Sequence, residues 1–211
     1  MSNLPVLYYV ADPMCSWCWG FTPTIEALNA HDQIALRYVM GGLAHDSDEP
    51  MPADMRAYVQ GAWREVAART GARFNWTFWE ECQPRRSTYP ACRAVLAAAG
   101  QDRGPAMFHR IQHAYYLEAQ NPSNDEVLVH LAAEFGLDTE RFAADLSSAS
   151  IAAALQDEFH LRRRLQATAF PSLVLELKGT YRWLSRGWKE QATVLARLDK
   201  ALQPTTKGGS A

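Results

Sequence analysis

Residues 12–20 read Asp-Pro-Met-Cys-Ser-Trp-Cys-Trp-Gly, and they directly follow the short apolar and aromatic run Leu4–Ala11. Such a run is typical of a central strand that is buried on both faces, and Asp12-Pro13 supplies the turn that ends it. The C-x-x-C motif therefore stands at the point where a buried strand is predicted to end.

The elements after the motif continue a regular alternation. Thr22–Ala30 has helical character, and Pro23 is expected to interrupt or kink that helix near its start. A second strand is predicted over Ile34–Met40, and Gly41-Gly42 ends it. The chain thus opens as strand, C-x-x-C, helix and strand, a β-α-β unit.

From Pro50 to about Leu165 the pattern changes to helices throughout. Apolar residues recur there at helical spacing, with Ser, Asn, Asp and Gly where such helices would begin or end. A stretch of roughly 115 residues is too long for a connection, so we expect a helical module of its own. Six helices are predicted in it: one from Met55 past Val66 to Gly71, then Tyr89–Ala99 after Ser87, Ala106–Ala119, Asp125–Phe135, a short one capped by Asp138, and Ile151–Leu165.

Two short strands and a helix complete the chain. Ser172–Leu177 and Thr180–Leu184 flank Lys178-Gly179, which is a hairpin signal, and Trp188–Leu202 closes as a helix. The prediction is an α/β protein, a thioredoxin fold with a large all-helical insertion. We expect the following division: residues 1–48 and 166–203 as the thioredoxin-type domain, 49–165 as the helical insertion, and 204–211 as a flexible tail.

Composition and charge exclude several classes of function. The chain has 211 residues, of which 48% are hydrophobic, and a formal net charge of −2. A chain of this size forms a stable hydrophobic core without structural disulfide bonds, so its four cysteines are available for chemistry. The one basic run, Arg162–Arg164, is expected to be a solvated helix end, and no nucleic-acid partner is predicted.

Location is predicted from what the sequence lacks. No uncharged apolar run approaches the roughly 18 residues of a membrane span, so we expect no membrane partner. The first ten residues carry no Lys or Arg and no small-residue cleavage site, which argues against a secretory signal. We therefore expect a cytoplasmic protein, in which a cysteine pair is more often catalytic or metal-bound than structural.

The spacing Cys15-x-x-Cys18 suits thiol–disulfide chemistry. Only a thiolate attacks a disulfide, and a helix N-terminus stabilises a thiolate through unpaired N–H groups and a partial positive charge. The spacing puts the first sulfur, exposed, at that terminus and the second about one turn deeper. Cys15 is predicted to be the nucleophile and Cys18 the resolving thiol. A zinc half-site and a pair of plain core cysteines are the alternatives, and we expect no metal and no cofactor.

A second candidate element, Thr168-Ala169-Phe170-Pro171-Ser172, directly precedes a predicted strand. A cis peptide bond before Pro171 would turn the backbone of Ala169 and Phe170 outward, where it could pair with an extended substrate. A trans proline on an edge strand is the alternative. We expect Pro171 to be cis and to lie beside the Cys15 sulfur.

Four apolar side chains are expected around the nucleophile, and they are Met14, Trp17, Trp19 and Phe170. They would form either an apolar peptide-binding surface or packing between the two parts of the chain, and packing is favoured for Trp19. The predicted substrate-binding residues are Met14, Trp17, Ala169, Phe170 and Pro171.

Other polar residues have two interpretations each. Cys82 and Cys92 are either a second redox pair or, more often for such residues, buried free thiols. His109 and His113 have a metal-like spacing, but a polar helix face is the better interpretation. Asp12 either influences proton transfer at Cys15 or makes the turn before it.

Three motifs carry a resemblance to a known family: Asp12–Gly20, Gly41-Gly42-Leu43, and Ala169-Phe170-Pro171-Ser172. With them the chain resembles the DsbA-like thiol–disulfide oxidoreductases, and within that family it is most similar to the cytoplasmic, FrnE-like branch of predicted protein-disulfide isomerases. The match covers most of residues 4–200. Ser16-Trp17 replaces the Pro-His of the periplasmic oxidases, and Phe170 stands where many relatives have Val or Thr.

The resemblance implies a thiol–disulfide oxidoreductase or isomerase that exchanges disulfides with protein or peptide substrates or with small thiols such as glutathione. One alternative is a glutathione-dependent transferase or isomerase of the kappa class, whose members resemble this architecture but use serine where Cys15 stands. The other is a redox-sensing binding or chaperone module.

Overall fold

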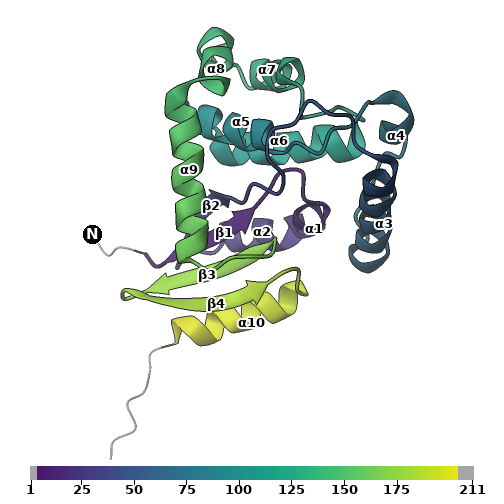
Figure 1. The fold of residues 1–211 in the computed structure, drawn as a ribbon. Helices are drawn as coiled ribbons and strands as arrows, with labels where there is room; N and C mark the ends of the chain where they lie inside the picture. The colour runs from purple at the N-terminus through teal and green to yellow at the C-terminus, as the bar shows by residue number, and fades with distance from the viewer. Residues whose placement is uncertain (1–3, 204–211) are drawn as a thin grey trace, which may run out of the picture.

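The computed structural model describes residues 4–203, and a four-stranded mixed sheet lies at its centre (Figure 1). The strands are β1 (Val6–Ala11), β2 (Ala35–Met40), β3 (Ser172–Leu177) and β4 (Thr180–Arg186), in the order β2-β1-β3-β4. β1 pairs in parallel with β2 and antiparallel with β3, and β3 pairs antiparallel with β4. The first and third strands, far apart in the sequence, are therefore neighbours at the middle of the sheet.

Helices α3 to α9 lie between β2 and β3 in the chain, and in Figure 1 most of them stand above the sheet. The bounds of the helices are α1 (Ser16–Trp19), α2 (Thr22–Asn29), α3 (Ala53–Thr70), α4 (Phe78–Glu81), α5 (Tyr89–Ala99), α6 (Gly104–Leu117), α7 (Asp125–Glu134), α8 (Thr139–Leu146), α9 (Ala149–Arg164) and α10 (Gln191–Leu202). The predicted α/β sheet with an all-helical insertion is confirmed.

Both faces of β1 are buried, as its apolar run predicts. Leu7 and Tyr9 join the main core cluster together with apolar residues of α2 and α10. Tyr8 and Val10 point to the opposite face and join a second cluster with Leu161 of α9. Alternate residues of one strand thus meet helices on the two sides of the sheet, and this fixes the position of the strand's carboxyl end.

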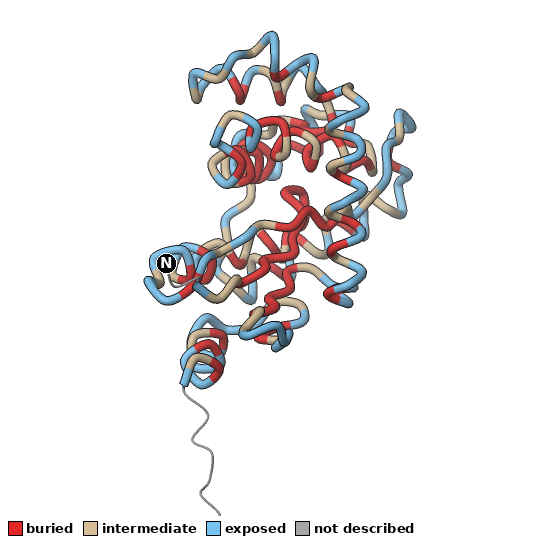
Figure 2. The backbone as a smooth tube through the Cα atoms, turned by 90° about the vertical axis from the view of Figure 1, so that its left-hand side faces the viewer, coloured by how far each residue is buried: buried red, intermediate tan, exposed pale blue. Residues whose placement is uncertain are grey.

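The helical insertion and the sheet share one continuous core. Trp63 of α3 is fully buried, with the rings of Phe74 and Tyr116 centred 4.9 and 5.3 Å from its own. Trp19, next to the cysteine pair, stacks on Tyr116 at 5.6 Å. Figure 2 shows the buried segments at the centre of the molecule, with exposed segments outlining it. Aromatic packing of Trp19 against Tyr116 therefore fixes the helical turn of the cysteine pair against the insertion.

Some local predictions need correction. Pro23 does not interrupt α2: it lies in the first turn, where its missing N–H costs no helical hydrogen bond. The residue before α5 is Thr88 rather than Ser87, and α4 was not predicted because one helical turn is too short to show periodicity. Asp138 caps α8 as predicted, because its carboxylate accepts a hydrogen bond from the Arg141 N–H at 3.0 Å.

The predicted tail at 204–211 lies outside the described residues, and the predicted limits of the two domains remain predictions. No helix within residues 4–203 has both the length and the hydrophobicity that a membrane crossing requires.

Candidate active site

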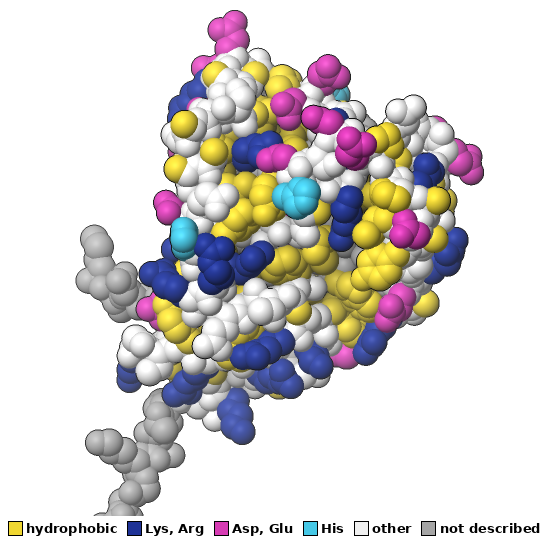
Figure 3. Space-filling view, in the orientation of Figure 1, with side chains coloured by type: hydrophobic (Ala, Val, Ile, Leu, Met, Phe, Trp, Pro, Cys, Tyr) yellow, Lys and Arg dark blue, Asp and Glu magenta, His cyan; other side chains and the backbone are white. Residues whose placement is uncertain are grey.

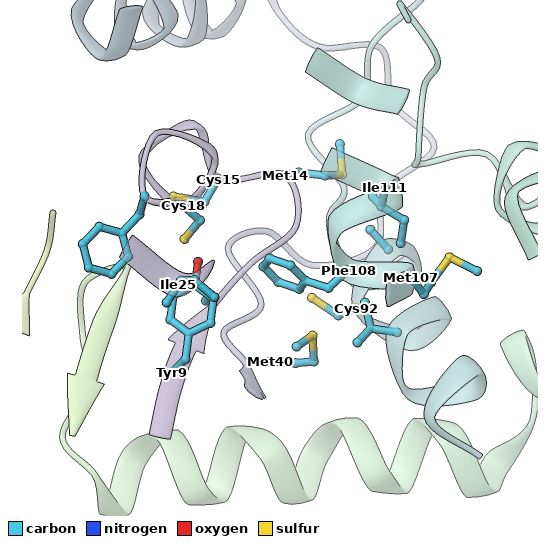
Figure 4. Packing of buried hydrophobic residues seen from close by; sticks show 14 of the residues in the cluster. Tyr9, Met14, Cys15, Cys18, Ile25, Met40, Cys92, Met107, Phe108 and Ile111 are labelled. Carbon is cyan, nitrogen blue, oxygen red and sulfur yellow. The ribbon is translucent and has the colours of Figure 1, made fainter. Parts of the chain in front are cut away.

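The cysteine pair lies on the first helical turn after β1. Cys15 is the N-cap residue of α1, and its carbonyl oxygen accepts hydrogen bonds from the N–H groups of Cys18 and Trp19 at 2.9 and 3.0 Å. Figure 4 shows the two cysteines on this turn, with Tyr9 of β1 below them and Met14 toward the insertion. The C-x-x-C spacing therefore places both thiols on the helical turn, as predicted.

Both thiols are free, and both residues are buried: Cys15 is 7% exposed and Cys18 is fully buried. The expectation that Cys15 would be exposed is therefore wrong. Part of its covering is Phe170, whose carbonyl oxygen accepts a long hydrogen bond from the Cys15 Sγ at 3.9 Å. Sequence spacing defines the turn but not what packs over it, so this burial could not be predicted.

The two thiols differ in how easily they ionise. Hydrogen bonding to the Cys18 thiol, together with the backbone N–H groups of Cys18 and Trp17, lowers the pKa of the Cys15 thiol below its ordinary value, although burial opposes the shift. Burial raises the pKa of the Cys18 thiol well above its ordinary value, and the neighbouring Cys15 sulfur adds to the rise. Of the two, Cys15 therefore gives up its proton first.

The segment that contains Pro171 approaches the cysteine pair through Phe170. The Phe170–Pro171 peptide bond is cis, and the Phe170 carbonyl is the group that reaches Cys15. The Ala169 carbonyl accepts a hydrogen bond from the Ser172 hydroxyl at 2.7 Å. Ala169 is exposed and Phe170 is half-buried, so this segment borders both the sulfur and the solvent.

Gly41 makes room for the Phe170 ring. A Cβ atom at Gly41 would lie 2.6 to 2.9 Å from three atoms of that ring, which is too close for any residue larger than glycine. The Gly41 carbonyl oxygen accepts a hydrogen bond from Arg162, whose guanidinium lies over the Phe170 ring at 5.8 Å. The glycine after β2 thus determines where the ring beside Cys15 can sit.

Asp12 is fully buried and holds three segments together. Its carboxylate accepts hydrogen bonds from the Met14 N–H at 2.8 Å, the Leu43 N–H at 2.7 Å and the Thr88 hydroxyl at 2.6 Å. The Cys92 Sγ lies 3.6 Å from the same carboxylate. Asp12 makes the turn before Cys15 and also anchors that turn to the segment after β2 and to the start of α5. Burial raises the pKa of its carboxyl group despite these hydrogen bonds.

Trp17 contacts two residues that the sequence analysis missed. Its ring lies 6.0 Å from the ring of Trp188, and the Arg69 guanidinium lies 6.0 Å from the Trp17 ring and 5.2 Å from the Trp188 ring. Arg69 belongs to α3 and Trp188 follows β4, so only the folded chain brings them to the cysteine pair. No local motif marks either residue.

The other candidate residues fall into structural positions. Met14 is 7% exposed and belongs to the core, so it offers little surface to a substrate. Trp19 donates its indole N–H to the Arg73 carbonyl at 2.9 Å, which supports the packing interpretation. The Nε2 atom of His109 is hydrogen-bonded to the Tyr38 hydroxyl at 2.8 Å, whereas the Nδ1 atom of His113 is hydrogen-bonded to the Glu118 carboxylate at 2.8 Å. Among the described residues, no cluster of His, Cys, Asp and Glu could hold a metal ion.

The two remaining cysteines have separate surroundings. Both are free thiols: Cys92 is fully buried beside Asp12, while Cys82 is half-buried and donates to the Ala119 carbonyl at 2.9 Å. Burial raises the pKa of both thiols, so neither is activated as Cys15 is. The free-thiol interpretation fits these surroundings better than a second redox pair.

The fold and the site together define a class of protein. A sheet of this strand order, a cysteine pair on the helical turn after its first strand and a cis-proline beside that pair are the features of a thioredoxin-fold protein. The family described as Thioredoxin matches residues 8–178 of the chain. Within this fold, the chain belongs to the DsbA-like family.

Solved structures similar to this chain span its whole architecture. The cytosolic disulfide reductase DsbM from Pseudomonas aeruginosa is 30% identical, with a TM-score of 0.79 over 93% of this chain and 98% of its own. DsbM has also been solved with GSH. A protein from Nitrosomonas europaea is 28% identical, with a TM-score of 0.84 over 95% and 98% of the two chains. The likeness to a 2-hydroxychromene-2-carboxylate isomerase, at 14% identity and a TM-score of 0.64, shows the fold alone.

The curated relatives are named as adapter proteins rather than as oxidoreductases. The ClpXP adapter protein SpxH from Bacillus subtilis is 28% identical over 171 residues, which cover 79% of this chain. The match spans 56% of the length of that relative, so a large part of SpxH has no counterpart in the matched region.

Proposed function

We propose that this protein is a thiol–disulfide oxidoreductase in which Cys15 attacks a disulfide and Cys18 completes the exchange. The observation that carries the proposal is the pair of free thiols on the helical turn after β1, with the Phe170 carbonyl oxygen 3.9 Å from the Cys15 Sγ. The opposite displacement of the two thiol pKa values, downward for Cys15 and upward for Cys18, supports the two roles. A nucleophile must be a thiolate at working pH, whereas a resolving thiol is needed only after the first step.

In the first step, the Cys15 thiolate attacks one sulfur of a substrate disulfide. A Cys15–substrate disulfide forms, the substrate S–S bond breaks, and the leaving thiolate takes a proton from solvent. The Phe170 carbonyl oxygen, 3.9 Å from the Cys15 Sγ, would lie close to the new S–S bond. Proline at 171 has no N–H, so it donates no hydrogen bond to the substrate.

In the second step, Cys18 loses its proton and attacks the Cys15 sulfur. The negative charge of the Cys15 thiolate contributes to the raised pKa of Cys18, and that charge disappears when the mixed disulfide forms. The pKa of Cys18 therefore falls when its thiolate is required. The second substrate thiolate leaves, so the substrate disulfide has gained two electrons and the Cys15–Cys18 pair has become a disulfide.

The relatives support a proposal for the substrates and for the location of this protein. Cytosolic DsbM has been solved with GSH, which supports a small thiol as one partner and a cytoplasmic setting for this chain. Protein or peptide disulfides, predicted from the sequence, are the other candidates. Phe170, Pro171, Trp17 and Ala169 are proposed to contact the substrate, because the Phe170 carbonyl reaches the Cys15 sulfur and the other three residues are close neighbours of Phe170 or Cys15 in the chain.

A binding module that only senses redox state is the competing function, and the name SpxH of the curated relatives is the observation that favours it. Reduced protein mixed with glutathione disulfide separates the two. We expect one Cys15–Cys18 disulfide and two molecules of released thiol per chain, with repeated turnover when a reductant regenerates the dithiol. Oxidation without turnover would favour the sensor.

The ionisation of Cys15 gives a direct pH test. Because the pKa of Cys15 is lowered, its alkylation by iodoacetamide should stay fast as the pH falls below about 8.5, where an ordinary thiol becomes protonated. Cys18 should react only at a pH well above that value. Peptide mapping of the alkylated sites across a pH series checks both, and a faster reaction at Cys18 would reverse the two roles.

Gly41→Val should damage the site through Phe170. The added side chain occupies the space of the Phe170 ring, so we expect the rate of disulfide exchange to fall by about tenfold and the free energy of unfolding by about 1–3 kcal/mol. Exchange kinetics and chemical denaturation measure the two effects. Gly61→Ala in α3 is the control, since no atom lies within 4 Å of the added Cβ, and it should stabilise the helix by about 0.5–1 kcal/mol.

A further inference from the structure

Two cavities lie on either side of Phe170. The larger, of about 640 Å³, is lined by Gly42, Leu43, Arg162, Arg163, Gln166, Ala167, Thr168 and Phe170. The smaller, of about 300 Å³, is lined by Trp17, Arg69, Phe170, Gly187 and Trp188. Phe170 borders both, and its carbonyl oxygen lies 3.9 Å from the Cys15 Sγ. A molecule with its sulfur at Cys15 could therefore extend into both cavities.

Neither cavity has an acidic residue among its described lining residues, although the chain carries a net negative charge. Within residues 4–203, no salt bridge involves Arg69, Arg162 or Arg163. Other arginines do have carboxylate partners, as Arg93 has Asp46 at 2.8 Å and Arg110 has Glu118 at 2.8 Å. The cations around the cysteine pair are thus available to an anion from outside.

The arginine positions are held by neighbouring groups rather than by acids. One N–H of Arg162 donates to the Gly41 carbonyl, and the guanidinium lies over the rings of Phe159 and Phe170 at 5.4 and 5.8 Å. Arg69 lies over the rings of Trp17 and Trp188. A guanidinium has five N–H donors, so each arginine retains several for a ligand. Figure 3 shows Lys and Arg side chains gathered at the lower end of α9, beside hydrophobic side chains.

We infer that the substrate at Cys15 is a small disulfide that carries a carboxylate on each side of its sulfur. One carboxylate binds Arg162 and Arg163 in the larger cavity, and the other binds Arg69 in the smaller one. Glutathione disulfide has this pattern, because each half bears a carboxylate at both ends of a tripeptide with the sulfur in the middle. The inference rests on the proposed function and adds the residues that select the substrate.

The positions of the arginines explain why an anionic disulfide would be preferred to a neutral one. Arginine pairs with a carboxylate through two parallel N–H···O hydrogen bonds, which fix orientation as well as supply affinity. With both ends held, the cysteinyl sulfur is confined to the region of Phe170 and Cys15. A neutral disulfide can reach the same sulfur but gains neither contact. Preference for the anionic substrate should also weaken at high ionic strength, because these cations are partly exposed.

The test compares two disulfides in single-turnover oxidation of the pre-reduced protein: glutathione disulfide and the neutral bis(2-hydroxyethyl) disulfide. Arg163→Gln and Arg69→Gln should each raise the glutathione disulfide concentration for half-maximal rate by about tenfold. The rate with the neutral disulfide should change by less than about twofold. The rate of Cys15 alkylation by neutral iodoacetamide should also be unchanged in both variants, which separates a lost ligand contact from an altered thiol.

Matched controls come from the same helices. Arg164→Gln on α9 removes the same charge one residue from Arg163, but Arg164 lines a different cavity together with Asp157 and Glu158. Arg64→Gln on α3 removes a charge that lies over Trp76 at 5.5 Å. Both variants should keep the preference of the parent protein for glutathione disulfide.

The outcomes separate the two proposals. Equal rates for the two disulfides in the parent protein, or an equal effect of Arg163→Gln and Arg69→Gln on both disulfides, would overturn the carboxylate inference and leave the oxidoreductase proposal standing. Oxidation of Cys15 by neither disulfide would overturn the oxidoreductase proposal and the inference with it.

Discussion

Cys15→Ser is expected to lower the rate of disulfide exchange by about 10³-fold or more, because a serine hydroxyl remains protonated at neutral pH and cannot attack a disulfide. The fold should be unaffected, since the two side chains are close in size and the hydrogen bond from the Cys15 sulfur to the Phe170 carbonyl is long, at 3.9 Å. Thiol release from a disulfide substrate, measured beside circular dichroism of the variant, checks both parts.

Cys82→Ser is the matched control for this prediction. It makes the same chemical change in a half-buried thiol that lies against the Ala119 carbonyl, and activity should stay within about twofold of the parent protein. If Cys82→Ser lost activity as completely as Cys15→Ser, the chemistry would have to include the second cysteine pair.

Asp12→Ala is expected to lower the free energy of unfolding by about 3–5 kcal/mol, a large fraction of the stability of a domain. The carboxylate accepts hydrogen bonds from Met14, Leu43 and Thr88. Alanine would leave the N–H groups of Met14 and Leu43 without this acceptor, whereas the Thr88 hydroxyl could still donate to the Ala44 carbonyl at 3.3 Å. Because the Met14 N–H is one residue before Cys15, exchange activity should fall as well. Chemical denaturation and exchange kinetics measure the two losses.

Asp138→Ala provides the comparison, since this aspartate accepts one exposed hydrogen bond at the start of α8 and its loss should cost only about 1 kcal/mol. A cost below about 1 kcal/mol for Asp12→Ala would show that the turn before Cys15 does not depend on the carboxylate.

The fold could be predicted because its signals are local. The apolar run of β1, the turn at Asp12-Pro13 and the helical periodicity of the insertion each depend on neighbouring residues, and the structure reproduces them within a few residues. The proline beside Cys15 could be placed because the chain order of thioredoxin-type elements fixes which strands pair. Short elements such as α4 have too few residues to show a pattern.

The rest of the site depends on contacts between distant segments. Each of the contacts that complete the site joins residues from different elements. Phe170 covers Cys15 and packs against Gly41, and Trp17 packs against Arg69 and Trp188. No periodicity or motif encodes such contacts, because they arise only when the insertion packs against the sheet. The basic run in the last turn of α9 shows the same limit: its residues were expected to be solvated, yet Arg162 packs beside Phe170.

The central claim, that Cys15 attacks and Cys18 resolves, is tested most directly by trapping the intermediate. The Cys18→Ser variant, reduced and then treated with glutathione disulfide, should accumulate one glutathione per chain, because the attack that would release it is missing. Mass spectrometry of the intact protein and of its non-reduced peptides should place that adduct on Cys15. An adduct on Cys82 or Cys92 instead, or no adduct at all, would contradict the assignment.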